Sequence, residues 1–318
     1  MTSRHAAHVW LFWIMCLIWG STWIPIKIGV QAMSPLLFAA SRSCAAGAIL
    51  LLVAWLRGMA VAAARSDLRT VVVAAVLANS VTYALLFWGI GLTDTGLSAV
   101  VNLSLTPVAL LAIGALMREE RITWTKSLAM LIGVAGLALL FSDKLRLDVP
   151  AIEIYGLSAV ALAAISFAGG MVVARRLTAR YSAIVTSGWL LLLGGLILGT
   201  AAIATGTARI DELSGLAHAP VLLSWLFLVL FSSVIAQTVF LRLSEAWVPS
   251  LAGLYAFVSP VIAVIAGIWL MNERLSPTAA VGMVLLLSTT VIALRLRNDH
   301  NASLQCRDRT KADVTRPC

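Results

Sequence analysis

Two stretches of this sequence match each other without a gap, AVVNLSLTPVALLAIGALMREERIT at residues 99–123 and AGLYAFVSPVIAVIAGIWLMNERLS at residues 252–276. Each stretch is a long apolar run that ends in a charged segment. The identical positions include a proline, a glycine, a glutamate and an arginine, in the pairs Pro107/Pro260, Gly114/Gly267, Glu120/Glu273 and Arg121/Arg274. Matches of these residue types at one offset indicate an internal duplication.

The apolar runs recur along the whole chain. Of its 318 residues, 61% are hydrophobic and only 12% are charged, whereas soluble domains have about 45–50% and 25%. This composition excludes a soluble globular protein. A helix needs about 20 predominantly apolar residues to cross a bilayer, and runs without an alternating period favour helices over barrel strands. We therefore predict an all-α integral membrane protein with ten transmembrane helices, at residues 9–29, 35–56, 70–91, 96–117, 123–142, 151–174, 182–205, 220–241, 247–271 and 276–296.

The duplication divides these ten helices into two sets of five, 9–142 and 151–296. They are flanked by a short N-terminal segment 1–8, a link 143–150 and a basic tail 297–318 that we expect to be disordered because it is polar. Since five is odd, the second set must enter the membrane from the opposite side. Such inverted-topology repeats form the central sites of many secondary transporters. A duplication that only enlarges a helical bundle is the alternative.

The net charge of +9 is explained by membrane topology. With ten helices the two termini share one side, and most Lys and Arg residues outside the helices fall on that side. The positive-inside rule predicts that both termini are cytoplasmic, in a protein of the cell (inner or plasma) membrane without a nucleic-acid partner. The four cysteines lie in predicted helices or in the tail, so we predict no disulfide.

Short motifs follow one another in a definite order between residues 10 and 296. They are Trp19-Gly20-Ser21-Thr22-Trp23 with Lys27, Arg42 with Ala46-Gly47, Thr106-Pro107 with Glu120-Arg121, and Ser259-Pro260 with Glu273-Arg274. In this order they resemble the EamA-type branch of the drug/metabolite transporter superfamily. The resemblance implies a five-plus-five inverted fold with a central cavity enclosed by helices 1–4 and 6–9. Members export amino acids, other metabolites or toxic compounds. The internal match fails at two places: Asn272 stands opposite Glu119, and Trp189 stands near the position equivalent to Arg42. We therefore expect the two halves to be functionally unequal.

Arg42 is the first candidate for substrate binding. It lies about seven residues into its predicted helix, where a charged side chain costs at least ~2.5–3.5 kcal/mol and usually faces a cavity or a partner. An anionic substrate group would be such a partner. Lys27, nearer the outer end of the first helix, is a candidate gate or second contact for a carboxylate. Snorkelling to the interface is the alternative for both side chains.

Other polar, aromatic and proline residues lie deep in the predicted helices. We predict that Asn79, Tyr83, Asn102, Thr106, Gln237, Tyr255 and Ser259 form one polar lining, although each also suits a hydrogen bond between helices. We predict Trp19, Trp23 and Trp88 as flat walls for an apolar substrate body. Pro25, Pro107 and Pro260 each remove a helix hydrogen bond, so we predict hinge or cavity-lining roles, with passive kinks as the alternative.

The sequence offers little for catalysis. No Asp or Glu lies in the interior of a predicted helix, since all of them fall in loops or at helix ends; the four histidines lie outside the helices, and no Walker motif is present. We therefore predict a non-enzyme without cofactor or metal, and transport without a buried carboxylate proton relay. The predicted function is secondary export of small organic metabolites by alternating access, with amino acids or amphiphilic carboxylates first. Multidrug efflux and, less favoured, a scaffold or sensor are alternatives. The predicted partners are the small-molecule substrate and the lipid bilayer. A homodimer is a further possibility that the sequence leaves undecided, because Gly169-Gly170 and Gly194-Gly195 allow close helix packing within or between chains.

Overall fold

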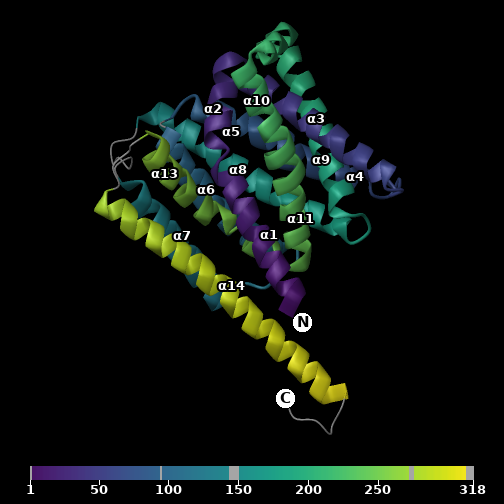
Figure 1. Ribbon diagram of the computed structural model, residues 1–318, viewed down its shortest axis with the longest axis vertical. Helices are drawn as coiled ribbons and strands as arrows, with labels where there is room; N and C mark the ends of the chain where they lie inside the picture. Colours follow the sequence, from purple (N-terminus) through teal and green to yellow (C-terminus); the bar gives the residue numbers. More distant parts are fainter. Residues whose placement is uncertain (1, 94, 143–149, 272–275, 313–318) are drawn as a thin grey trace.

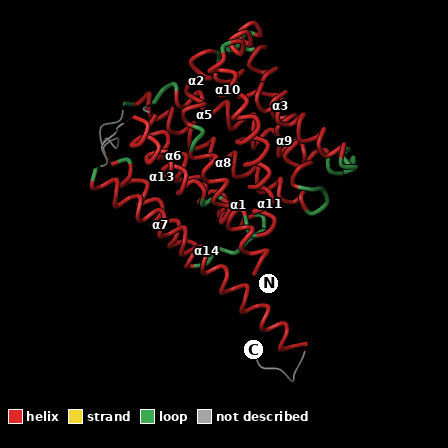
Figure 2. Tube along the Cα trace, in the orientation of Figure 1, coloured by secondary structure: helices red, strands yellow, loops and turns green. Residues whose placement is uncertain are grey.

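The computed structural model describes residues 2–93, 95–142, 150–271 and 276–312, and these residues form helices and short connections without a strand (Figure 2). The N-terminus of α1 and the C-terminus of α11 lie close to each other in the lower part of the helical bundle in Figure 1, and α2 and α10 lie at its upper end. We call the lower end, which carries the N-terminus of α1 and the C-terminus of α11, the terminal end. The elements are α1 (Thr2–Gly20), α2 (Trp23–Ala32), α3 (Pro35–Leu56), α4 (Leu68–Ala75), η1 (Val76–Val81), α5 (Thr82–Ile90), α6 (Thr95–Leu116), α7 (Trp124–Leu140), α8 (Ala151–Thr178), α9 (Ala183–Ala204), η3 (Ile210–Ala217), α10 (Ala219–Phe227), η4 (Leu228–Ala236), α11 (Gln237–Ala246), α12 (Pro249–Ala252), α13 (Tyr255–Met271) and α14 (Pro277–Ala312).

Within the described ranges, eight helical segments are long and apolar enough to cross a membrane, and two apolar helices, Trp124–Leu140 and Pro249–Ile265, are shorter. Each of these ten segments overlaps one of the ten apolar blocks of the sequence. The chain is therefore a multi-pass membrane protein, as its composition predicts. Both lie within the predicted helices 123–142 and 247–271, and α13 continues to Met271. In the second of them the helix is interrupted between α12 and α13 at Gly253 and Leu254.

The first predicted helix is broken in two. α1 ends at Gly20 and α2 begins at Trp23, and the break lies four residues before Pro25, which cannot donate a hydrogen bond to the Ser21 carbonyl. Local hydroxyls bind carbonyls at the break, because Ser21 Oγ donates to Leu17 O and Thr22 Oγ1 donates to Trp19 O at 2.7 Å. Pro107 and Pro260 lie inside α6 and α13, which continue past them.

Two membrane segments contain a π-helical stretch. η1 joins α4 to α5, and η4 joins α10 to α11. The two stretches match at the offset of 153 residues that relates the opening sequence stretches, with Ser80 opposite Ser233. A π-helix takes one more residue per hydrogen-bonded turn, so it leaves carbonyls without their usual donors and occurs frequently at functional sites.

Helices α3 and α9 form a long antiparallel seam. A Cβ on Gly47 would lie 2.4 Å from Leu192 N, and one on Gly195 would lie 2.9 Å from Cys44 N. These glycines permit contact between the two backbones. The two helices also have the same length, with boundaries 148 residues apart, and each is followed by a glycine with positive φ, Gly58 or Gly206.

Helices α7 and α14 form a second antiparallel pair on one side of the molecule (Figure 1), where Gly136 meets Leu286 and Gly282 meets the backbone of Leu140. α14 then extends beyond the bundle to Ala312. The sequence predicts disorder for residues 297–318, yet the structure continues the helix through most of this tail. Neither Gly nor Pro interrupts the chain between Thr278 and Ala312 except Gly282, so nothing in the tail forces the helix to stop.

Candidate functional site

The candidate site is a cavity of about 160 Å³ within the bundle, at the depth of η1 and η4. Side chains from both halves of the chain meet there, and the lining contains no Asp or Glu among the described residues. The lining residues are Trp19, Arg42, Ala78, Thr82, Tyr83, Leu86, Asn102, Thr106, Phe167, Leu191, Ser232, Ser233, Gln237 and Tyr255. The cavity therefore combines one cation, several hydroxyl and amide groups, and apolar and aromatic surface.

Arg42, on α3, is the charged group of this cavity. Only 5% of the residue is exposed. Its Nη1 donates to Ser233 Oγ at 3.0 Å, and its Nη2 donates to Tyr83 Oη at 2.5 Å. Its Cζ also lies 5.0 Å from the centre of the Tyr83 ring. In the described part of the chain no carboxylate pairs with this guanidinium, so its charge is held by neutral groups and is available to an anion.

Aromatic side chains form another part of the cavity wall. Trp19 and Tyr255 contact each other edge to face with ring centres 4.2 Å apart, and Phe240 lies behind both. Trp19 is fixed by its indole N–H, which donates to Ser232 O at 3.3 Å. Such rigid rings offer an apolar surface of the kind that surrounds bound small molecules.

The structure brings seven of the twelve predicted binding residues to this cavity: Trp19, Arg42, Tyr83, Asn102, Thr106, Gln237 and Tyr255. Lys27 is exposed on α2, and Trp88 is 57% exposed on the outer surface of α5. Neither lines the cavity. The side chain of Trp23 lies outside the described residues.

Two further predicted residues, Asn79 and Ser259, are buried in helix contacts beside the cavity. Asn79 Nδ2 donates to Ser43 Oγ at 3.2 Å, which is the interhelical role that the sequence left open. Ser259 lies where α13 contacts α1 at Gly20. In the described part of the chain Ser259 Oγ and Asn79 Oδ1 have no hydrogen-bond partner. The hinge role of the prolines stays a prediction. Pro107 directly follows the lining residue Thr106, and Pro260 directly follows Ser259.

The sequence-based prediction missed Ser232 and Ser233, the cavity residues of η4. Ser233 orients Arg42, and Ser232 offers its carbonyl to Trp19. On η1 the carbonyl of Leu77 accepts hydrogen bonds from Thr82 Oγ1 at 2.7 Å and Ser166 Oγ at 2.8 Å. The match between Ser80 and Ser233 at the 153-residue offset would have pointed to this segment.

An ion-pair network lies at the terminal end of the molecule. We call it the acidic junction, because Glu119 and Glu120 lie at its centre. Glu119 accepts from Arg175 Nη1 and, at 2.8 Å, from Arg176 Nε. The side chain of Glu120 is fully buried and accepts from Lys126 Nζ at 2.7 Å and from Ser250 Oγ at 2.6 Å.

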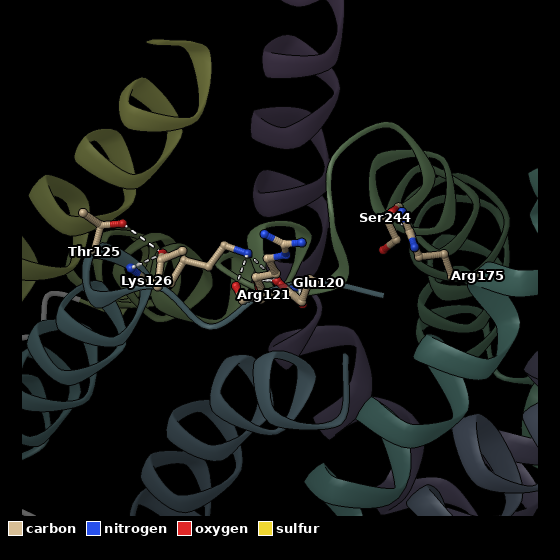
Figure 3. Close-up of polar contacts among 8 residues, drawn as sticks. Glu120, Arg121, Thr125, Lys126, Arg175 and Ser244 are labelled. Carbon is tan, nitrogen blue, oxygen red and sulfur yellow. Dashed lines mark hydrogen bonds and ion pairs between the residues drawn. The ribbon is translucent and has the colours of Figure 1, made fainter. Parts of the chain in front are cut away.

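Figure 3 shows Lys126 pointing to Glu120 and to the backbone of Arg121, and Arg175 beside Ser244. Arg175 Nε donates to Ser244 O at 2.6 Å. The acidic junction thus ties the end of α6 to α7, α8, α11 and α12. It joins elements of the first half of the chain to elements of the second half.

Further polar contacts between the halves lie at both ends. At the terminal end Asp67 accepts from Tyr181 Oη at 2.8 Å and from Arg180 Nη1 at 2.9 Å, and Trp189 Nε1 donates to Val61 O at 2.9 Å. At the opposite end Glu212 of η3 accepts from Ser34 N at 2.6 Å. There the hydrogen bond from Arg209 also lowers the pKa of the exposed Asp211 carboxyl. Cross-half contacts are thus more numerous at the terminal end in the described part of the chain.

Comparison with known proteins identifies the family. A model of the EamA-like transporter family matches the chain twice in tandem, over residues 7–142 and 154–295. The chain belongs to the EamA-like transporter family. This confirms the resemblance seen in the sequence motifs, and the two matches coincide with the two predicted sets of five helices. At the level of the family the protein is therefore a membrane transporter.

Individual EamA-like relatives are distant. The uncharacterized inner membrane transporter YedA of Escherichia coli is 29% identical over 272 residues, 82% of this chain and 81% of YedA. Protein PecM of Dickeya dadantii is 29% identical over 290 residues, 88% of this chain and 90% of PecM. One crystal structure of a protein superposes with a TM-score of 0.77 and 18% identity, covering 92% of this chain and 98% of the other. At that identity the superposition supports the fold alone.

Proposed function

We propose that this EamA-like protein is an inner-membrane secondary transporter that exports small amphiphilic carboxylates, amino acids among them, by alternating access. The observation that carries this proposal is Arg42, which is buried in the cavity and has no carboxylate partner among the described residues. A charge-assisted hydrogen bond from a buried arginine to a substrate carboxylate is worth about 1.5–3 kcal/mol. The aromatic wall at Trp19 and Tyr255 suits the apolar part of the same molecule.

The proposed architecture has ten membrane helices in two inverted sets of five around this cavity. Two observations support it. The helices α3 and α9, which occupy equivalent places in the two sets, are antiparallel, and so are α7 and α14. The π-helical stretches also fall at equivalent places and meet at the cavity. We further propose that both termini are cytoplasmic, as the distribution of Lys and Arg indicates.

Cationic drugs fit this cavity poorly. Arg42 repels a cation, and no described lining residue carries a negative charge to offset that repulsion. The volume of about 160 Å³ is also below the ~300–1,000 Å³ typical of sites for drug-sized ligands. These features favour a small carboxylate over a multidrug substrate.

The test is ligand-induced thermal stabilisation of the detergent-purified protein, with a panel of amino acids, organic acids, nucleobases and cationic drugs. A ligand at 100 times its Kd adds about 2.7 kcal/mol if it binds only the folded state. We expect a carboxylate to stabilise the native protein and the matched control Arg65→Gln, and to stabilise Arg42→Gln about 10- to 100-fold more weakly in apparent affinity.

Flux in proteoliposomes then separates a carrier from a scaffold or sensor. A carrier moves the stabilising carboxylate, and Arg42→Gln abolishes that movement while the variant keeps its melting temperature. Stabilisation by cationic compounds alone, equal in native protein and Arg42→Gln, would refute the carboxylate site. Ligand binding without any flux would refute the transport function.

A further inference from the structure

A second and larger cavity, of about 590 Å³, lies at the terminal end between α1, α3, α9 and the segment η4–α11. It shares no lining residue with the central cavity. α3 contributes Leu50, Val53 and Arg57 to one wall, and α11 contributes Thr238 and Arg242 to the facing wall. The cavity is therefore a separate crevice between two membrane segments, and we call it the terminal crevice.

The terminal crevice has an apolar wall and a basic rim. Leu50, Val53, Ile184 and Val239 line its inner part. Ile235, which also lines it, is 39% exposed. An exposed apolar side chain of a membrane-spanning segment is suited to contact with lipid, so we infer that the apolar wall continues into the lipid-facing surface. The crevice is thus accessible to an acyl chain from the side.

The basic rim consists of Arg57 at the end of α3 and Arg242 near the end of α11. Both arginines are exposed, and in the ranges that the structure describes neither pairs with a carboxylate. Glu245 is the acidic residue of the described lining. Its single negative charge does not balance the positive charges of Arg57 and Arg242, so the rim carries a net positive charge. Arginines bind phosphate oxygens in bidentate geometry, and basic pockets between membrane helices at the cytoplasmic face bind anionic headgroups.

A buried polar atom lies between rim and wall. Thr238 lines the crevice, and its Oγ1 is buried without a hydrogen-bond partner in the described part of the chain. Leaving such a hydroxyl unpaired is unfavourable. Because this oxygen is shielded from solvent, an ester or glycerol oxygen below a phosphate group would pair with it after the Thr238 side chain rotates toward the crevice.

We propose that the terminal crevice binds one anionic phospholipid, with an acyl chain along Leu50, Val53 and Ile235 and the phosphate at Arg57 and Arg242. The lipid belongs to the leaflet that meets the terminal end. The lipid bridges α3 of the first half to the segment η4–α11 of the second half. The hydrogen bond between Arg42 and Ser233 joins the same two segments. The site is independent of the substrate proposed for the central cavity.

The test measures lipid binding by native mass spectrometry and by melting temperature, with phosphatidylglycerol, phosphatidylcholine and inorganic phosphate as probes. We expect the native protein to retain phosphatidylglycerol at least 10-fold better than phosphatidylcholine, and phosphate alone to have little effect. The double variant Arg57→Gln/Arg242→Gln loses this preference. The matched double variant Arg65→Gln/Arg69→Gln removes two exposed arginines of the same end and keeps it.

A crevice-filling variant tests the acyl chain separately. Thr238→Trp places a large ring in the crevice and keeps both arginines, so we expect it to fold and to lose bound phosphatidylglycerol. Equal retention of the two phospholipids by the native protein would overturn the proposal. So would stabilisation by phosphate equal to that by phosphatidylglycerol, or unchanged lipid retention in both the arginine double variant and Thr238→Trp.

Discussion

Arg42 depends on its neighbours for its orientation. Tyr83 Oη is one of two hydroxyls that accept hydrogen bonds from it, and Tyr83→Phe removes this hydroxyl while keeping the ring beneath the guanidinium. Since one hydrogen bond is worth about 0.5–1.5 kcal/mol, we expect about 2- to 10-fold weaker carboxylate affinity at an unchanged melting temperature. Binding isotherms measure this, with Tyr155→Phe, on the exposed face of α8, as control. Equal effects of the two substitutions would contradict a role of Tyr83 in the site.

Arg118 has a backbone conformation that its side chain disfavours. Its φ of 61° places it in the left-handed region, where a residue other than glycine costs of order 1–2 kcal/mol. This turn directs Glu119 and Glu120 into the acidic junction. We expect Arg118→Gly to raise the stability by about 1 kcal/mol in thermal unfolding, whereas Arg121→Gly, at an ordinary φ, lowers it. A loss of stability in Arg118→Gly would show that the side chain matters more than the turn.

At the scale of the elements, the acidic junction is the contact that ties α6 to α7 and α12. Glu120→Gln leaves Lys126 without its ion-pair partner, and because Lys126 is only partly exposed we expect a loss of about 1–3 kcal/mol. Thermal unfolding of Glu120→Gln, Lys126→Gln and the double variant gives the coupling energy. Glu153→Gln, which removes a carboxylate without an ion pair in the described residues, is the control. A coupling energy near zero would mean that packing alone holds these helices.

The α3–α9 seam depends on glycine. Gly47→Ala would place a methyl group 2.4 Å from the backbone of Leu192, and since neither backbone can move independently, we expect a loss of about 1–3 kcal/mol or more and poor yield of folded protein. At Gly199 the new methyl group would meet only the Ala40 side chain at 3.2 Å, so Gly199→Ala should be milder. Comparing size-exclusion profiles and melting temperatures of the two variants tests this order, and a reversed order would contradict the seam as described.

For the whole molecule, the proposed inverted arrangement determines which loops share a side. We expect Arg65→Cys, in the link after α3, to react with an impermeant thiol reagent only from the cytoplasm. Arg209→Cys, between α9 and η3, should react from outside. The background is a variant whose four native cysteines are serine. Labelling of intact cells and of opened membranes separates the two sides, and reaction of both positions from one side would exclude the proposed topology.

Hydropathy predicted an all-helical membrane protein and the places of its apolar segments because it measures transfer into lipid. It does not measure backbone hydrogen bonding, so the break at Ser21 and Thr22 and the π-helical stretches were not predicted. It also does not specify which side of an apolar helix faces inward. Trp88 was therefore predicted in the cavity, although it lies on the outer surface. Arg42 does line the cavity, as expected for a charge whose burial is costly, and its role in substrate binding stays a prediction.

The π-helical stretches also bear on the history of the protein. One extra residue at the same place in both halves is explained most simply if the ancestral five-helix unit already carried it before the gene was duplicated. A unit of five helices cannot form this cavity alone, because the lining comes from both halves. If the proposed inverted arrangement holds, two identical copies assembled in opposite orientations in one membrane before the duplication. The unequal residues at Arg42 and Trp189 then record the specialisation that fusion of the two copies permitted.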